Sequence, residues 1–572
     1  MKALATLIVR RRFWLILAIG LMTVFFAAQV RHLKIVIDPS AMLPKAHPNV
    51  IGTTAAETLF GSKYVVVIGV SAAAGGTAMQ PAVLQTVADL SRDLAQVPGV
   101  KAHTLLSATA ERARAISGSA DEMKVQPLLP TPVTAKGIAA LSTFLADNPI
   151  YQNTVISQDQ TLASISFSVN VGPKGFREVM DKVQVVLDKA QTPQVKVISS
   201  GTAVFFANVE RFSARMAFLF PIALVLIGLI HLEAFRTKQG LFLPLVTAIL
   251  AVIWSLGIMG AAGVSMDAFN ATTPILILAV AAGHAVQILK RYYEEYDRLC
   301  KAHPNDPLYS LNDRAIVDSL TKVAPVMLTA GLVAALGFFS LLTFEIANIR
   351  TFGLFTGLGI LSALLIELTF IPALRSYLPA PRPKLSEDGA GKPRVWDRLA
   401  HRLTQLVIER HRSIIVGFAV LGVLAVVAMS NINRENSTKS YFGEGLQLRQ
   451  EDRVLNDKLA GTNTLYVVFK GDRADHMKDP AVLATIESAQ KFIATLPDVG
   501  KTISIVDLLK QMNRAMNGGA HSAYTLPATA ELVSQYLLLY SMSGQPTDFD
   551  AYIDYDYRNA NLQVWMKNDS SK

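Results

Sequence analysis

The strongest constraint on the fold of this chain is a set of seven long apolar stretches. A helix needs about 20 predominantly apolar residues to cross the hydrocarbon of a bilayer. Only 17% of the 572 residues are charged and the mean hydropathy is +0.34, whereas soluble proteins average about 25% charged residues. The sequence therefore predicts a multi-pass membrane protein. The predicted spans are Phe13–Val30, Met216–Leu232, Leu241–Val264, Ala268–Leu289, Val323–Thr343, Phe352–Leu374 and Ile414–Ile432.

The first apolar stretch has two interpretations. Arg10, Arg11 and Arg12 precede it, and a basic segment before an apolar run is also typical of a cleaved signal peptide. The segment Phe26–Gln29 is a poor cleavage site because it lacks a clear small-residue pattern. We therefore interpret residues 13–30 as an uncleaved membrane anchor.

Basic residues concentrate in alternate connections between the spans. The segment before the first span and those after the second, fourth and sixth spans together hold 21 basic and 11 acidic residues. Their net charge of +10 equals the formal net charge of the chain, so the charge does not require a nucleic-acid partner. The positive-inside rule places these segments in the cytoplasm. We expect a bacterial inner-membrane protein with cytoplasmic residues 1–12 and 379–413, and periplasmic residues 31–215 and 433–572.

The sequence also contains an internal repeat with an offset of about 400 residues, and repeats of this kind determine domain organisation. Four pairs of segments recur in the same order, each weak by itself. They are Leu7–Arg10 with Val407–Arg410, Phe60–Ser62 with Ala460–Thr462, Leu94–Val100 with Ile493–Val499, and Thr161–Val169 with Asn559–Met566.

The first periplasmic segment is predicted to contain two strand–helix–strand units separated by a helical insert, which fits a split βαβ, ferredoxin-like module. The second copy ends after the strand near Leu562–Met566. We interpret the chain as seven spans of an expected twelve with an incomplete second periplasmic domain, although an end at Lys572 could also be natural. The predicted elements are Lys63–Val70, Pro81–Val97, Lys101–Leu106, Thr161–Asn170, Phe176–Ala190 and Val195–Ser200.

This layout of one span, a large external domain, five clustered spans (216–378) and a second start resembles the RND superfamily. Pro325–Leu342 (PVMLTAGLVAALGFFSLL), Ile349–Phe355 and Gly357–Leu374 resemble the fifth and sixth spans of its MMPL and sterol-sensing-domain branch. Gly283–Glu295 (GHAVQILKRYYEE) resembles the fourth span, which typically ends in an Arg-aromatic-x-Glu-Glu pattern. The resemblance implies a dimeric or trimeric, proton-driven exporter of hydrophobic or lipid-like molecules.

The chain departs from the family at the residue that usually relays protons. Where the fourth span normally carries a carboxylate, the sequence reads Gly283-His284-Ala285-Val286-Gln287. His284 lies about 9 Å inward from Lys290, and Glu367 about 12 Å inward from Arg375, at 1.5 Å per helical residue. Ionisable residues within the membrane indicate function, and histidine exchanges protons near neutral pH. We therefore predict a His284–Glu367 relay, with Gln287 orienting the imidazole; the alternative is a neutral packing histidine.

Small residues in the spans predict close helix packing, which also permits helices to slide. The candidate glycines are Gly283, Gly331, Gly337, Gly353 and Gly357.

Several functional classes lack support in the sequence. There is no Walker A loop, no Gly-x-Ser-x-Gly elbow and no Cys/His metal spacing, so we expect no cofactor, no metal and no catalytic residues. The single cysteine, Cys300, is interpreted as a free thiol. We expect membrane lipids, a hydrophobic substrate and periplasmic or outer-membrane proteins as partners. Three alternatives remain: a lipid- or sterol-sensing regulator, an inactive fragment, and a translocation accessory resembling the SecD/SecF pair.

Overall fold

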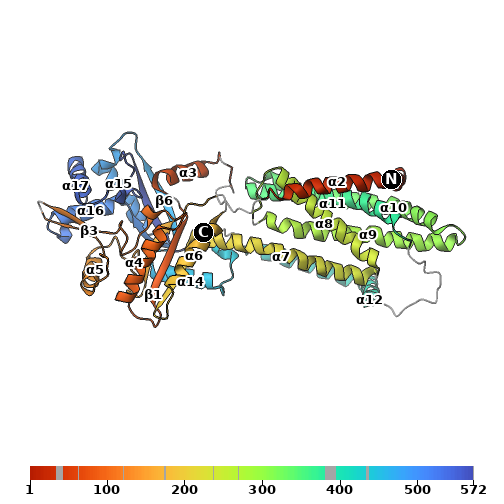
Figure 1. Ribbon diagram of the computed structural model, residues 1–572, viewed down its shortest axis with the longest axis horizontal. Coiled ribbons are helices and arrows are strands. Elements are labelled where there is room, and N and C mark those ends of the chain that lie inside the picture. The colour runs from red at the N-terminus through yellow and green to blue at the C-terminus, as the bar shows by residue number, and fades with distance from the viewer. Residues whose placement is uncertain are drawn as a thin grey trace.

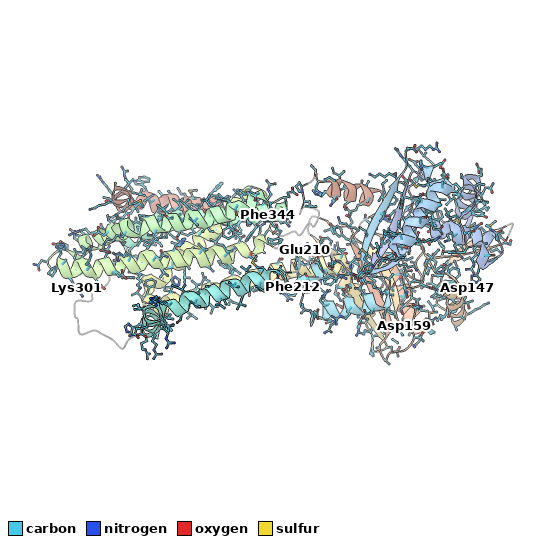
Figure 2. All side chains as sticks on the ribbon, turned by 180° about the vertical axis from the view of Figure 1, so that it is seen from behind. Asp147, Asp159, Glu210, Phe212, Lys301 and Phe344 are labelled. Carbon is cyan, nitrogen blue, oxygen red and sulfur yellow. The ribbon has the colours of Figure 1, made fainter. Side chains whose placement is uncertain are left out.

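The computed structural model describes residues 1–33, 43–44, 46–61, 63–119, 122–172, 175–235, 237–267, 269–380, 395–432 and 437–570. The molecule is elongated, with a helical bundle at one end and an α/β domain at the other (Figure 1). Helix α7 runs from the α/β domain along the bundle. Figure 2 shows Lys301 at the far end of the bundle, Asp147 at the far end of the α/β domain, and Glu210 and Phe212 at the junction.

Seven helices within the described ranges are long and apolar enough to cross a membrane. This confirms the predicted membrane bundle of seven spans. The short helices α1 (Lys2–Arg10) and α12 (Val395–Glu409) precede the first and last of them. The seven are α2 (Arg12–Val30), α7 (Thr202–Phe235), α8 (Lys238–Ala261), α9 (Thr273–Ala302), α10 (Leu308–Phe339), α11 (Ala347–Tyr377) and α13 (His411–Met429).

Several of these helices are longer than the apolar stretches that reveal them. Helix α7 begins at Thr202 instead of Met216, and α10 begins at Leu308 instead of Val323. Helix α9 continues to Ala302, past the predicted end at Leu289. Hydropathy detects only the part of a helix that matches hydrocarbon, so polar continuations are missed. Two of these continuations build the far end of the bundle, and that of α7 joins the bundle to the α/β domain.

The first module of the α/β domain is a three-stranded antiparallel sheet with the order β4-β1-β5. Its helices α4 and α6 follow β1 and β4 in the chain, as the sequence predicts. In order, its elements are α3 (Pro48–Phe60), β1 (Val65–Ala72), α4 (Pro81–Ala95), β2 (Arg114–Gly118), β3 (Met123–Pro127), α5 (Ala135–Asp147), β4 (Ala163–Ser168), α6 (Phe176–Ala190) and β5 (Val195–Ser200).

One predicted strand of this module is wrong in its centre. In place of a continuous ladder, residues 100–106 form isolated bridges with β4 and the residue after it, Val100 with Val169 and Leu106 with Ser166, and Ala102–Thr104 forms a short 3-10 helix. The hydroxyl of Thr104 accepts the backbone N–H of Ser168 at 2.9 Å. A side chain thus takes the place of a backbone ladder bond, which periodicity alone does not reveal.

The second module is a three-stranded antiparallel sheet with the order β6-β8-β7. The two modules are arranged alike. In the first, β4 lies between β1 and the segment 100–106 that follows α4, and in the second, β8 lies between β6 and β7. Its elements are α14 (Gln447–Lys458), β6 (Asn463–Lys470), α15 (Pro480–Ile493), β7 (Val499–Ile503), α16 (Ile505–Met516), α17 (Ala530–Ser543) and β8 (Asn559–Met566).

The two modules interlock and share one hydrophobic core. The β2–β3 hairpin of the first module packs against α16 and α17 of the second, and α14 of the second packs on β5 of the first. At the α14 contact, the Ser200 hydroxyl donates to Asp452 at 2.6 Å. The Lys501 ammonium donates to the carbonyls of Pro149 and Ile150 at 2.5 and 2.7 Å. The modules therefore form one domain, although more than 200 residues of membrane helix and connection separate them in sequence.

Candidate functional site

Within the helical bundle, two ionisable side chains lie next to each other. His284 on α9 and Glu367 on α11 approach to 3.3 Å between Nδ1 and Oε2. The Glu367 side chain is fully buried and that of His284 is 14% exposed. The surroundings are apolar: Ala285 on α9 and Ile366 and Ile371 on α11 belong to the packed core of the bundle.

The carboxylate of Glu367 depends on His284 for its electrostatic environment. The two groups lie at ion-pair distance without an aligned hydrogen bond, and neither Glu367 oxygen has another hydrogen-bond partner among the residues that the structure describes. An isolated buried carboxylate is costly, and a buried pair that shares protons titrates as a unit. The arrangement can therefore take up a proton on the imidazole to form an ion pair with the carboxylate, and release it to leave a neutral imidazole beside the carboxylate.

The sequence pattern of the MMPL family matches residues 62–406. This range includes β1–β5 and α4–α6 of the first module of the α/β domain, helices α7–α11 and both members of the pair. The chain belongs to the MMPL family. MMPL proteins are membrane transporters of the RND superfamily, and they generally export lipids or other hydrophobes.

Three relatives of this MMPL protein are named only as membrane proteins. MJ1562 of Methanocaldococcus jannaschii is 23% identical over 387 residues, which are 65% of this chain and 92% of the relative. ActII-3 of Streptomyces coelicolor is 23% identical over 329 residues, covering 55% of this chain and 43% of the relative. SCO5905 of the same organism is 22% identical over 410 residues, covering 66% and 46%. The aligned part of this MMPL chain thus spans less than half the length of the two Streptomyces relatives.

Gln287, which is predicted to orient the imidazole, does not contact the pair in the described part of the chain. Gln287 is exposed one turn beyond His284. In the part of the chain that the structure describes, no hydrogen bond joins Gln287 to His284 or Glu367. On α9 the side chains three residues apart diverge, because His284 turns toward α11 and Gln287 does not.

A second histidine joins α7 to the helix that carries His284, and the sequence pattern did not single it out. The ring of His231 is 3% exposed; its Nδ1 lies 2.7 Å from the Ile227 carbonyl and its Nε2 3.3 Å from the Ala282 carbonyl. Ala282 precedes His284 by two residues on α9. Helix α7, which continues into the α/β domain, thus contacts α9 two residues from the pair.

A polar network fixes the helices of the bundle end that lies far from the α/β domain. Arg375 on α11 is 1% exposed and donates to the Tyr292 hydroxyl of α9 at 2.5 Å. That hydroxyl donates to Asn312 of α10 at 2.6 Å. Buried Glu295 on α9 also pairs with Lys322 of α10 at 2.6 Å. These contacts hold α10 against α9 and α9 against α11, and α9 and α11 are the helices that carry the pair.

Three of the predicted packing glycines form the α10–α11 contact. A Cβ atom at Gly331 would meet the Leu364 side chain at 2.9 Å, one at Gly353 the Phe338 carbonyl at 2.5 Å, and one at Gly357 the Phe339 ring at 2.5 Å. Gly283 and Gly337 do not fit the expectation, because a Cβ atom there would meet nothing within 4 Å among the described residues. Helical spacing alone cannot tell which face of a span meets a neighbour.

Other glycines make closer approaches. Gly257 and Gly260 of α8 lie against Phe26 and Gln29 of α2, and Gly359 of α11 lies against Ile277 of α9. Within the described ranges there is no group of three or more His, Cys, Asp or Glu residues arranged to hold a metal ion. Cys300 is a free, buried thiol.

Proposed function

We propose that this protein is a secondary active export permease that couples proton entry to the movement of a hydrophobic or lipid-like substrate through His284 and Glu367. The observation that carries the proposal is the 3.3 Å approach of these side chains inside an apolar bundle. Ionisable groups at such depth are costly and mark proton or ion pathways in transporters. The pair would replace the carboxylate that the fourth span lacks.

Proton uptake would change the attraction between α9 and α11. Before uptake, a neutral imidazole lies beside an ionised carboxylate and the attraction is only that of a charge for a dipole. Uptake forms the imidazolium, and the two helices then attract each other as an ion pair. Coulomb energy between neighbouring charges in a low-dielectric interior is large enough to bias a two-state helix arrangement. Because His231 joins α9 to α7, and α7 enters the α/β domain, the same change would reach the substrate-handling part of the molecule.

The proposed orientation places the N-terminus in the cytoplasm of a bacterial cell, with residues 1–12 and 379–413 on that side. The α/β parts at 31–215 and 433–572 then lie in the periplasm. The net charge of +10 in the alternate connections supports this orientation through the positive-inside rule. A homodimer or homotrimer and a periplasmic or outer-membrane partner belong to the same proposal.

Proton flux in proteoliposomes tests the function. The purified chain is reconstituted with entrapped pyranine, a pH gradient is imposed, and phenylnaphthylamine is added as a neutral hydrophobic probe. We expect probe-stimulated proton flux that is lost in His284→Ala and in Glu367→Gln. The matched controls are His401→Ala and Glu294→Gln, which change exposed residues outside the pair.

Two results would contradict the proposal. Full flux in both His284→Ala and Glu367→Gln would remove the pair from coupling. Absence of gradient-dependent flux in the unsubstituted protein would favour the lipid-sensing alternative, in which the bundle responds to lipid without transport.

A further inference from the structure

A cavity of about 490 Å³ lies where the two modules of the α/β domain meet. Its wall combines the end of α3 and the segment 101–112 of the first module with residues 550–556 of the second. A cavity of this size accommodates a drug-sized molecule. Because both modules line it, its shape depends on how they are held relative to each other. The charged lining residues are Glu57, Lys101, His103, Arg112, Asp550, Asp554 and Asp556.

Most of the acidic residues in this wall are already engaged or face solvent. Glu57 pairs with Lys63 at 3.6 Å. The Asp554 carboxylate accepts the backbone N–H groups of Arg558 and Asn559 at 2.7 and 3.0 Å. Asp556 is exposed at the rim. Asp550 is also exposed, and its carboxylate makes no hydrogen bond or ion pair with the described part of the chain.

The basic residues of the wall, in contrast, have no charged partner within the described ranges. Lys101, His103 and Arg112 form no ion pair with any residue that the structure describes, although all three line the same cavity. Lys101 and Arg112 are close enough to His103 to contribute, after its partial burial, to lowering the pKa of the imidazole. Lys101 and Arg112 thus carry charges that no ion pair neutralises, and an oxyanion is the group that would pair with them.

Arg112 also connects the cavity to a narrow aromatic pocket of about 40 Å³. Its guanidinium lies 5.1 Å from the centre of the Tyr552 ring. Its Nη2 is buried without a hydrogen-bond partner among the described residues, and so is the indole Nε1 of Trp565 in the same pocket. Buried donors in native proteins are normally satisfied, so these two N–H groups are placed to receive acceptor oxygens. Phe60, Phe167 and Tyr466 supply the apolar remainder of the pocket wall.

We propose that this inter-module cavity binds a small amphipathic anion, with its carboxylate, sulfonate or phosphate group on Arg112 and Lys101 and its apolar part against Leu59, Phe60 and Ile553 of the cavity wall. A guanidinium with a free donor recognises oxyanions through charge-assisted hydrogen bonds, and aromatic faces accept rings or chains by apolar contact. The proposal rests on the proposed export function and specifies its substrate class as acidic amphiphiles.

Binding of two matched dyes to the full-length chain in lipid nanodiscs tests the proposal. Anilinonaphthalene sulfonate is anionic, and phenylnaphthylamine is the same ring system without the sulfonate. Energy transfer from Trp565 reports occupancy of the cavity, and its loss in Trp565→Phe identifies the signal. We expect saturable binding of the sulfonate and weaker binding of the neutral dye, which partitions into the bilayer.

Substitution of the guanidinium should remove the preference for the anion. Arg112→Gln should weaken sulfonate binding about 10- to 100-fold, the loss typical of a hydrogen bond to a charged group, and leave the neutral dye unchanged. Lys101→Gln should have a smaller effect in the same direction, whereas Arg112→Lys should restore part of the affinity. The control Arg92→Gln changes an exposed arginine of α4 that pairs with Asp89 at 3.1 Å, far from the cavity wall.

Acidification supplies a second readout. Partial burial, with Lys101 and Arg112, lowers the pKa of His103, so the ring is neutral at pH 7 and gains its charge only on acidification. Burial raises the pKa of Asp550, so on acidification this carboxylate begins to lose its charge at a higher pH than a free aspartate does. Both changes favour an anion, and a sulfonate does not titrate. We expect the affinity for the sulfonate to rise about fivefold as the pH falls from about 7.5 to about 5.5. The rise should be smaller in His103→Gln.

The outcomes separate this inference from the proposed function. Equal affinity for the two dyes, or sulfonate binding by Arg112→Gln like that of the unsubstituted chain, would overturn the anion site even if proton flux is intact. Sulfonate binding that depends on Arg112 would support the site even if His284→Ala and Glu367→Gln keep full proton flux, because dye binding requires no proton gradient.

Discussion

Substitution of Glu210 should loosen the junction between the membrane bundle and the α/β domain. Glu210 lies on α7 at this junction (Figure 2) and is 4% exposed. Its two carboxylate oxygens accept the backbone N–H groups of Phe176 and Arg177, at 3.1 and 2.7 Å. These are the first residues of α6, whose N-terminal donors have no partner within the helix. Glu210 thus fastens α6 to α7.

The expected cost follows from these two bonds. Each charge-assisted hydrogen bond contributes roughly 1.5 kcal/mol, so Glu210→Ala should lower the free energy of local opening of α6 by about 3 kcal/mol. Glu210→Gln keeps one acceptor oxygen and should cost about half as much by the same reasoning. The control Glu178→Gln changes a residue of α6 that pairs with Lys182 near the surface, and a pair of this kind is worth about 0.5 kcal/mol.

Hydrogen exchange measured by mass spectrometry on the full-length chain checks the prediction. A change of about 3 kcal/mol should speed exchange of the α6 peptide 176–190 by about 100-fold. Peptides of α15 in the second module should change little. Exchange of α6 in Glu210→Ala at the rate of the unsubstituted chain would refute the reasoning, because α6 would then be held by its apolar face alone.

Two further substitutions probe the packing of each part. Lys439 and Asp452 are both buried and pair at 2.9 Å, so Lys439→Met should cost about 3–5 kcal/mol by leaving an uncompensated charge. Adding Asp452→Asn should recover much of this in denaturant unfolding monitored by pulse proteolysis; no recovery would contradict the charge argument. In the bundle, Gly359→Val would collide with Ile277 and should cost about 1–3 kcal/mol. Gly337→Val, with open space around it, is the control, and equal melting temperatures would contradict the close-packing interpretation.

The membrane character and the mixed architecture were predictable from local sequence. Hydrocarbon offers no partner for backbone N–H and C=O groups, so a long apolar run has to form a helix wherever it lies in the chain. The same locality explains why α6 and β5 have the predicted bounds, since amphipathic periodicity ends where their packed faces end. The strand predicted at 101–106 failed because a Thr104 side-chain bond competes with the ladder.

The approach of His284 to Glu367 depended on tertiary structure. The sequence placed both at similar depths in two spans, but depth does not determine rotation, and rotation decides whether side chains on different helices meet. Gln287, on the same helix as His284, illustrates the difference: spacing predicted a shared face, and helix packing left Gln287 exposed.

The sequence by itself determined that seven segments cross a membrane and that strands and helices alternate outside it, because both properties arise from neighbouring residues. Tertiary structure decided that the two modules interlock around one core and that Arg112, Tyr552 and Trp565 line one pocket. Arg112 lies more than 400 positions from Tyr552 and Trp565. Only the packing of β8 and its neighbouring loop against the first module brings them together, and no local pattern encodes a contact at that separation.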